Sequence, residues 1–413
     1  MRYSALEVIP YQLILTAHQI ALYAYLGPTA YGQFGMSFAF IYLIVAAGMG
    51  GFYQQLIRKP ANFTETIEDI IIVHIVFVVS LLLCCYSIIS SIPQVGSDCS
   101  PFYALRCMLD QQTFVVTGLI IIAEIIHRTG KLLLYRLHVN RIPALGEVVG
   151  ILIYCGTVWG IYAFTGTISF QSIFLPLLCM AAANGIFYWF NLMRQLPCSW
   201  CNLWFNLMRQ PQQLSKLLYE RYTAAAYYCI INLWNSNSLI LLLGAAYGKI
   251  PAIGNCKLAT HYLALITAII DHIAGMSLSL TLRVTAKDPM PLLVVALRIA
   301  ALLGGTNLLL LLVGYPCIQL FCIPSASADY LPVMLFAMLC SIEQLTIPWL
   351  HIAYVNGSWP QYTLVAGAQL GAAAIAYTNN ASITTLLAAM VAAKLISSIL
   401  VITGQHQRTK KPA

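Results

Sequence analysis

The sequence predicts an all-α polytopic membrane protein with about 12 transmembrane helices in two parallel six-helix halves around a central cavity. Composition is the first observation behind this prediction, since 60% of the 413 residues are hydrophobic and only 8% are charged. A soluble domain carries about 25% charged residues. The second observation is that apolar runs of about 20 residues, the length that crosses some 30 Å of hydrocarbon, recur along the whole chain. The third is a glycine-containing phrase that occurs once in each half.

The apolar runs define two sets of six predicted spans. The first set covers 8–26, 34–57, 67–91, 112–135, 144–164 and 170–192, and the second covers 222–246, 252–282, 289–313, 329–351, 361–378 and 382–403. We therefore predict an amino-terminal lobe over 1–192, a cytoplasmic connector over 193–221, a carboxyl-terminal lobe over 222–404 and a basic cytoplasmic tail over 405–413.

The repeated phrase lies between the first two spans of each predicted half. It reads LGPTAYGQFG from Leu26 to Gly35 and LGAAYGKIPAIG from Leu243 to Gly254. In both copies an apolar helix ends at Leu-Gly, where glycine permits a left-handed backbone, and a second Gly begins the next helix. Recurrence in the same direction predicts two parallel halves, an architecture typical of transporters.

The charged residues outside the spans predict the orientation of the chain. If the amino terminus is cytoplasmic, the inner loops carry most of the Lys and Arg, Arg221 among them, and the outer loops hold only Arg106, Lys249 and Lys257. This is the positive-inside pattern, and it predicts a multi-pass protein of the cytoplasmic (inner) membrane with both termini in the cytoplasm. The scattered cations form no basic face or reading motif, so we expect no nucleic-acid partner.

The connector contains two local features. The heptapeptide WFNLMRQ occurs at Trp189–Gln195 and again at Trp204–Gln210. It is either a neutral tandem duplication or an amphipathic stretch on the cytoplasmic membrane surface. Cys198 and Cys201 form a lone CxxC without a second pair, so we expect no metal site there.

The fourth span carries the most informative polar residues. Glu124, Arg128, Lys131 and Tyr135 are spaced 4-3-4, which places them on one helical face with His127 beside them. Glu124 and Arg128 can pair within the helix, which would leave Lys131 as an unbalanced cation. The face either lines a cationic cavity or lies at the cytoplasmic interface with its cations reaching the headgroups.

Other intramembrane polar groups are candidates for binding or ion coupling. Asn235 and Asn237 lie in the seventh span, Asp271 and His272 in the eighth, and Glu343 in the tenth. An Asp next to a His can exchange protons near neutral pH, although a salt bridge from Asp271 to another helix is an equal alternative. The sequence has no phosphate-binding GxxxxGK[ST] loop and no catalytic constellation, so we expect neither an enzyme nor a cofactor.

The two phrases LGPTAYGQFGMSFAFIYLI and SNSLILLLGAAYGKIPAIGNCKLATHYLALI resemble the polysaccharide flippases of the multidrug/oligosaccharidyl-lipid/polysaccharide exporter superfamily. The resemblance extends over nearly the full length, and the double occurrence of the phrase carries it. Many family members have a charged residue just before the Leu-Gly of the seventh span. Here Asn237-Ser238 precede an uncharged run, which argues against a charge-based role at this point.

The resemblance implies transfer of a polyprenyl-diphosphate-linked oligosaccharide across the membrane by alternating access. On this hypothesis Arg128, Lys131 and His127 would hold the diphosphate, and Tyr135, Asn235 and Asn237 would bind sugar hydroxyls. Ion coupling would use Glu124, Asp271, His272 or Glu343. The implied partners are membrane lipids and the glycosyltransferases and polymerase of the same pathway.

Several alternatives remain open at this point. A cation-coupled multidrug exporter of the same superfamily would more often place acidic groups in its cavity, whereas the fourth span leans cationic. A membrane-embedded polysaccharide-assembly enzyme should lack the two-half repeat. A peptidoglycan-precursor flippase would have two further spans, and a membrane scaffold without transport is the remaining possibility.

Overall fold

The computed structural model describes residues 2–50, 52, 73–84, 87, 111–137, 139, 141–195, 215–223, 225–226, 251, 253–258, 261 and 382–409, with single positions between 305 and 379. All the regular secondary structure in these parts of the chain is helical. Three helices there are long and apolar enough to cross a membrane, namely Pro10–Met49, Arg141–Thr165 and Ser172–Gln195. The apolar helices Val73–Cys84 and Thr384–Leu400 are shorter.

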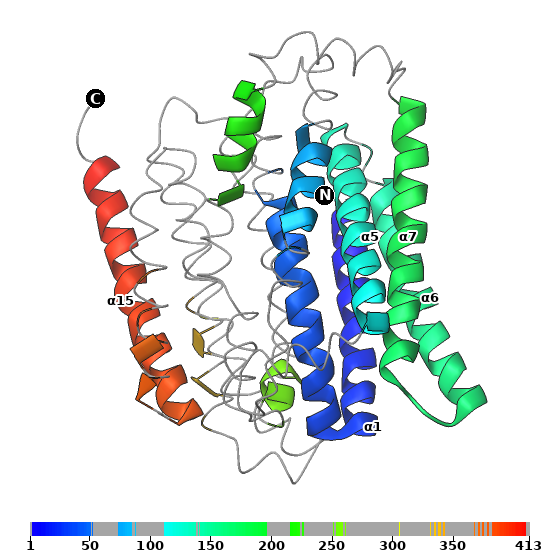
Figure 1. Ribbon diagram of the computed structural model, residues 1–413, viewed down its shortest axis with the longest axis horizontal. Helices are drawn as coiled ribbons and strands as arrows, with labels where there is room; N and C mark the ends of the chain where they lie inside the picture. The colour runs from blue at the N-terminus through cyan, green and yellow to red at the C-terminus, as the bar shows by residue number, and fades with distance from the viewer. Residues whose placement is uncertain are drawn as a thin grey trace. The chain divides into compact units, whose positions relative to one another are not determined.

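The first labelled helix, α1 (Arg2–Met49), contains the first predicted span and residues 34–49 of the second (Figure 1). Its apolar stretch from Pro10 to Met49 is 40 residues long, about twice the length that crosses the hydrocarbon core. The helix is interrupted at Gly27, whose φ of 74° and ψ of 169° are not helical. Pro28 follows at the start of the second part, where a missing backbone donor costs nothing. The predicted helix end at Leu26-Gly27 is therefore confirmed.

Three helices of the amino-terminal part coincide with the predicted fourth, fifth and sixth spans. They are α5 (Gln111–Arg136), α6 (Arg141–Thr165) and α7 (Phe170–Gln195), and both α5 and α6 pack against α7. At the other end of the chain, α15 (Ile383–Thr409) covers the predicted twelfth span from its second residue and continues beyond it. The third predicted span is described over 73–84 and at 87, and the seventh to eleventh lie mostly outside the described residues.

Glycines let the helices around α7 approach one another closely. A Cβ atom added to Gly150 of α6 would lie 2.5 Å from Nδ2 of Asn184 on α7. A Cβ atom on Gly130 of α5 would lie 3.1 Å from Cβ of Tyr188. A Cβ atom at Gly150 would force the Asn184 side chain to shift, and one at Gly130 would require its neighbours to move by a few tenths of an ångström. Glycine at both positions therefore favours the close packing of these helices.

The surface of α5 that faces away from Glu124 and Lys131 is apolar. Val115, Leu119, Ile122 and Ile126 are exposed and are spaced 4-3-4, so they share a face different from that of Glu124 and Lys131. Exposed aliphatic side chains in this arrangement suit contact with lipid. Helix α5 therefore presents an apolar face outward and a charged face to its neighbouring helices.

Contacts divide the chain into two compact units. One unit consists of Met1–Phe40 and Leu233–Ala413, and the other of Ile41–Asn232. The lobe boundaries predicted from the sequence stay a prediction.

Within the first of these units, Gly254 at the end of the second copy of the phrase packs on the first copy. A Cβ atom on Gly254 would lie 2.2 Å from the carbonyl oxygen of Pro28, and one on Gly35 would lie 3.2 Å from Cγ of Lys257. Hydrogen bonds flank this approach, because the Tyr23 hydroxyl donates to Oδ1 of Asn255 and the Tyr31 hydroxyl donates to Oε1 of Gln19. The repeat thus marks a contact in space as well as a similarity in sequence.

Candidate functional site

The charged face of α5 forms as the sequence spacing predicts. Nε of Arg128 donates to Oε2 of Glu124 over 3.1 Å, which confirms the pair within the helix. The Glu124 side chain is 3% exposed and that of Arg128 is 40% exposed, so the carboxylate is buried and the guanidinium reaches outward. The guanidinium also lies over the ring of Tyr42, 4.9 Å from its centroid.

A carboxylate from α6 completes the site and changes its charge. Nζ of Lys131 donates to Oε1 of Glu147 over 3.0 Å, and the Glu147 side chain is 8% exposed. The expectation that Lys131 is an unbalanced cation is therefore wrong. Tyr135 lies nearby, with the Lys131 ammonium 5.9 Å from the centroid of its ring.

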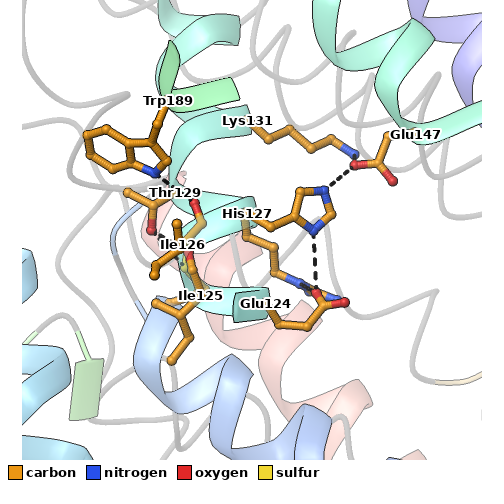
Figure 2. Close-up of polar contacts among 10 residues, drawn as sticks. Glu124, Ile125, Ile126, His127, Thr129, Lys131, Glu147 and Trp189 are labelled. Atoms are coloured by element: carbon orange, nitrogen blue, oxygen red, sulfur yellow. Dashed lines mark hydrogen bonds and ion pairs between the residues drawn. The ribbon is translucent and has the colours of Figure 1, made fainter. Parts of the chain in front are cut away.

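His127 lies between the two carboxylates (Figure 2). Its Nε2 is 2.8 Å from Oε1 of Glu147, and its Nδ1 is 3.6 Å from Oε2 of Glu124. An ionised carboxylate only accepts hydrogen bonds. An imidazolium could donate toward both neighbours, whereas a neutral imidazole could donate toward only one. The geometry of His127 therefore suits a group that gains and loses a proton.

The formal charges of these five side chains balance. Glu124 and Glu147 contribute two negative charges, Arg128 and Lys131 contribute two positive charges, and a proton on His127 adds one more. Charges buried at membrane depth are tolerated when they are paired in this way. We call Glu124, His127, Arg128, Lys131 and Glu147 the charge cluster. A single proton changes its total charge from zero to plus one.

Aromatic residues of α7 hold the cluster in place. The Tyr188 ring lies 5.4 Å from the His127 ring, and its hydroxyl donates to the carbonyl oxygen of Pro143 over 3.0 Å. A Cβ atom on Gly146 would lie 2.5 Å from that hydroxyl, so glycine at this position makes room for it. Nε1 of Trp189 donates to the carbonyl oxygen of Ile126 and ties α7 to α5.

Sequence analysis did not identify Glu147, although one signal for it was present. The turn near Val139 joins α5 and α6, and Lys131 and Glu147 are equally far from it along the chain. Two helices joined by so short a turn are antiparallel neighbours. A cation and a carboxylate at matching distances from such a turn can therefore face each other across the pair.

The remaining candidates lie outside the part of the chain that the structure describes: Asn235, Asn237, Asp271, His272 and Glu343. The positions of Cys198 and Cys201 and the second copy of WFNLMRQ are likewise not described. Among the described residues, no group of three or more His, Cys, Asp and Glu side chains is arranged to hold a metal ion.

Comparison of the sequence with known proteins finds no matching family model and no matching curated protein. Comparison of the structure does find matches. One is the inward-facing conformation of a multidrug resistance MATE family transporter of the MOP superfamily, with a TM-score of 0.55, 13% identity, and coverage of 97% of this chain and 96% of that one. Another is an outward-facing conformation of a transporter so described, with a TM-score of 0.52, 14% identity, and coverage of 98% and 95%.

At this level of identity the matches establish the fold. They extend over almost the whole of both chains, so the prediction of an all-helical, multi-pass membrane protein is confirmed. The chain has the fold of the MATE transporters of the MOP superfamily, membrane proteins with 12 helices in two lobes.

Proposed function

We propose that this protein is a membrane transporter that works by alternating access. The observation that carries the proposal is the fold, which matches a transporter structure in an inward-facing and one in an outward-facing conformation over at least 97% of the chain. A two-lobe fold of this kind can expose one central site to each side of the membrane in turn. The matched structures are transporters, which favours a carrier over an enzyme.

We further propose that the charge cluster is the site at which this transporter binds its coupling proton. His127 lies within 4 Å of two buried carboxylates, Glu124 and Glu147. Binding or losing one proton there changes the net charge of a buried site by one unit. A change of this kind can bias two conformations that differ in how well they solvate the cluster.

For the substrate, we propose an organic cation, which the protein exports in exchange for protons. The matched structures are described as multidrug resistance transporters, which favours this class. The sequence argued against this class of substrate because the fourth span carries an excess of positively charged side chains. Glu147 answers that argument, because it pairs with Lys131 and gives the cluster no net charge when His127 is neutral.

The second candidate is a flippase for a polyprenyl-diphosphate-linked oligosaccharide, with glycosyltransferases and a polymerase as its partners. The doubled Leu-Gly phrase favours it, and Gly254 at the end of the second copy packs on Pro28 of the first. Its proposed headgroup ligands are less available than the sequence implies, since Arg128 and Lys131 each have a carboxylate partner. Both candidates place the protein in the cytoplasmic membrane with both termini in the cytoplasm, as the loop charges indicate.

Purified protein in sealed vesicles would test these proposals. We expect ethidium, as a lipophilic cation, to move against its gradient when a pH gradient is imposed. A labelled polyprenyl-diphosphate oligosaccharide supplied to the same vesicles should stay in its original leaflet. Transfer of the labelled lipid without ethidium movement would replace the exporter with the flippase, and movement of neither would contradict both substrate assignments.

A further inference from the structure

Arg221 is fully buried, although the sequence places it among the cations of an inner loop. It belongs to the helical residues 215–223, at the end of the predicted connector. Arginine is almost never fully buried unless its donors are satisfied. Its surroundings therefore show what the end of the connector is attached to.

The guanidinium of Arg221 caps the end of α1. Its two terminal nitrogens donate to the carbonyl oxygens of Gly48 and Gly50, the first of these through Nη2 over 2.7 Å. Carbonyls in the last turn of a helix lack partners within the helix and carry partial negative charge. The guanidinium also stacks on the Phe77 ring, 4.2 Å from its centroid, which covers its flat face.

A directed chain of hydrogen bonds runs from Arg221 to α5. Nη2 of Arg221 lies 3.0 Å from Nδ1 of His74, and Nε2 of His74 lies 3.0 Å from Oγ1 of Thr129. Arginine can only donate, so Nδ1 of His74 accepts and Nε2 carries the hydrogen that His74 donates to Thr129. The Thr129 hydroxyl in turn donates to the carbonyl oxygen of Ile125 over 2.7 Å.

The backbone after Arg221 also lies close to the end of α1. A Cβ atom on Gly50 would lie 3.2 Å from Cα of Ala225. Contacts group the chain as far as Asn232 with the unit that begins at Ile41, which agrees with this attachment. The segment that leads to the carboxyl-terminal part of the chain is thus fixed to the bundle that contains α5.

We propose that Arg221, His74 and Thr129, the Arg221 latch, fasten the end of the connector to this bundle and couple its position to the charge cluster. Thr129 lies between His127 and Lys131 in the sequence, and the chain of hydrogen bonds ends at Ile125, next to Glu124. A movement of this turn of α5 when the cluster changes charge is passed to Arg221 through His74. The coupling rests on the proposed role of the cluster, whereas the fastening does not.

Spin labelling of the connector tests the fastening. Tyr219 is 73% exposed and lies one half-turn before Arg221, so a label on Tyr219→Cys, in a full-length chain whose native cysteines are replaced, reports the motion of this helix. We expect slow motion of the label in the parent chain and motion severalfold faster with Arg221→Ala. Arg221→Lys should give an intermediate rate, because lysine keeps the positive charge and loses the two terminal nitrogens that bind two carbonyls at once. Lys216→Ala, an exposed change in the same helix, should leave the motion unchanged.

An unchanged label motion in Arg221→Ala would overturn the fastening.

The coupling is tested with Thr129→Val, which keeps the shape of the side chain and removes the oxygen that His74 binds. Glu147→Gln should alter the motion of the label in the parent chain and not in Thr129→Val. An equal response in both chains, or a response in neither, would overturn the coupling. These readouts need no substrate, so they stand apart from any failure of the transport assay.

Discussion

The contact between α5 and α6 and the contact between α1 and residues 253–258 are both buried, and they use different chemistry. The first is formed by ionisable groups, with Glu147 shared between His127 and Lys131. The second contains the neutral hydrogen bond of Tyr23 with Asn255 and the close approach of Gly254 to the backbone of Pro28, and the stem of the Lys257 side chain packs beside Gly35. One proton can change the state of the charged contact, whereas the Tyr23–Asn255 hydrogen bond and the backbone approach at Gly254 contain no group that titrates near neutral pH. We therefore propose proton-dependent chemistry for the first contact and a fixed register of the helices for these parts of the second.

The largest effect should follow Glu147→Ala in the charged contact. This change removes the carboxylate partner of Lys131 and leaves His127 with Glu124 alone. Breaking a buried ion pair on one side costs about 3–5 kcal/mol. Thermal unfolding in detergent would measure the loss. Adding Lys131→Ala should recover part of it, because the unpaired cation is then gone. A double variant as unstable as the single one would contradict the ion-pair explanation.

Next in size is Gly254→Ala in the neutral contact. The new Cβ atom would lie 2.2 Å from the carbonyl oxygen of Pro28, so the two helices must separate. Overpacking of this kind costs about 1–3 kcal/mol, and the same unfolding measurement applies. Gly118→Ala is the matched control, since a Cβ atom there meets nothing within 4 Å. Equal stability of the two variants would remove the evidence for a fixed register.

Gly146→Ala sharpens the comparison, because it makes a similar clash against a side chain. Its Cβ atom would lie 2.5 Å from the Tyr188 hydroxyl and 2.6 Å from Cε1 of the same ring, so the clash is with a side chain and not with backbone. We expect a smaller loss of stability than for Gly254→Ala. Adding Tyr188→Phe should recover little, because Cε1 and Cζ of the ring would still lie 2.6 Å and 2.9 Å from the new Cβ atom. Full recovery in the double variant would mean that the hydroxyl alone causes the clash.

The smallest effect should follow Tyr23→Phe in the neutral contact. The variant loses the hydrogen bond to Oδ1 of Asn255, and an uncharged hydrogen bond contributes about 0.5–1.5 kcal/mol. The loss should be independent of pH between 5 and 8, since neither partner titrates in that range. Unfolding curves measured across this range would reveal a pH-dependent loss, which would show that the contact is not neutral.

Local features of this fold follow from the sequence. The break at Gly27 follows from the Leu-Gly phrase, and the pair of Glu124 with Arg128 follows from a spacing of four on one helix. Each of these depends only on residues close together in the chain. The periodicity of apolar residues likewise predicts α5, α6 and α7 to within a few residues.

Contacts between distant segments could not be predicted from one sequence. Arg221 meets Gly48 and Gly50 more than 170 residues away, and nothing local distinguishes it from the other loop cations. His74 receives its role from Arg221 and Thr129, which lie on two other segments. The partner of Lys131 was within reach, but only by combining the short turn at Val139 with the charges on both sides of it. Such roles depend on helix packing, which composition and periodicity leave open.

The proton dependence of transport in Glu147→Gln tests the central claim most directly. Glutamine keeps the size of the side chain and an acceptor for Lys131, and it removes the charge that faces His127. Vesicles with this variant should still exchange ethidium across the membrane at equal concentrations and should no longer accumulate it under a pH gradient. Glu220→Gln, the same change on the connector helix, should behave as the unmodified protein. Accumulation by Glu147→Gln that follows the pH gradient as in the unmodified protein would contradict a coupling site at the charge cluster.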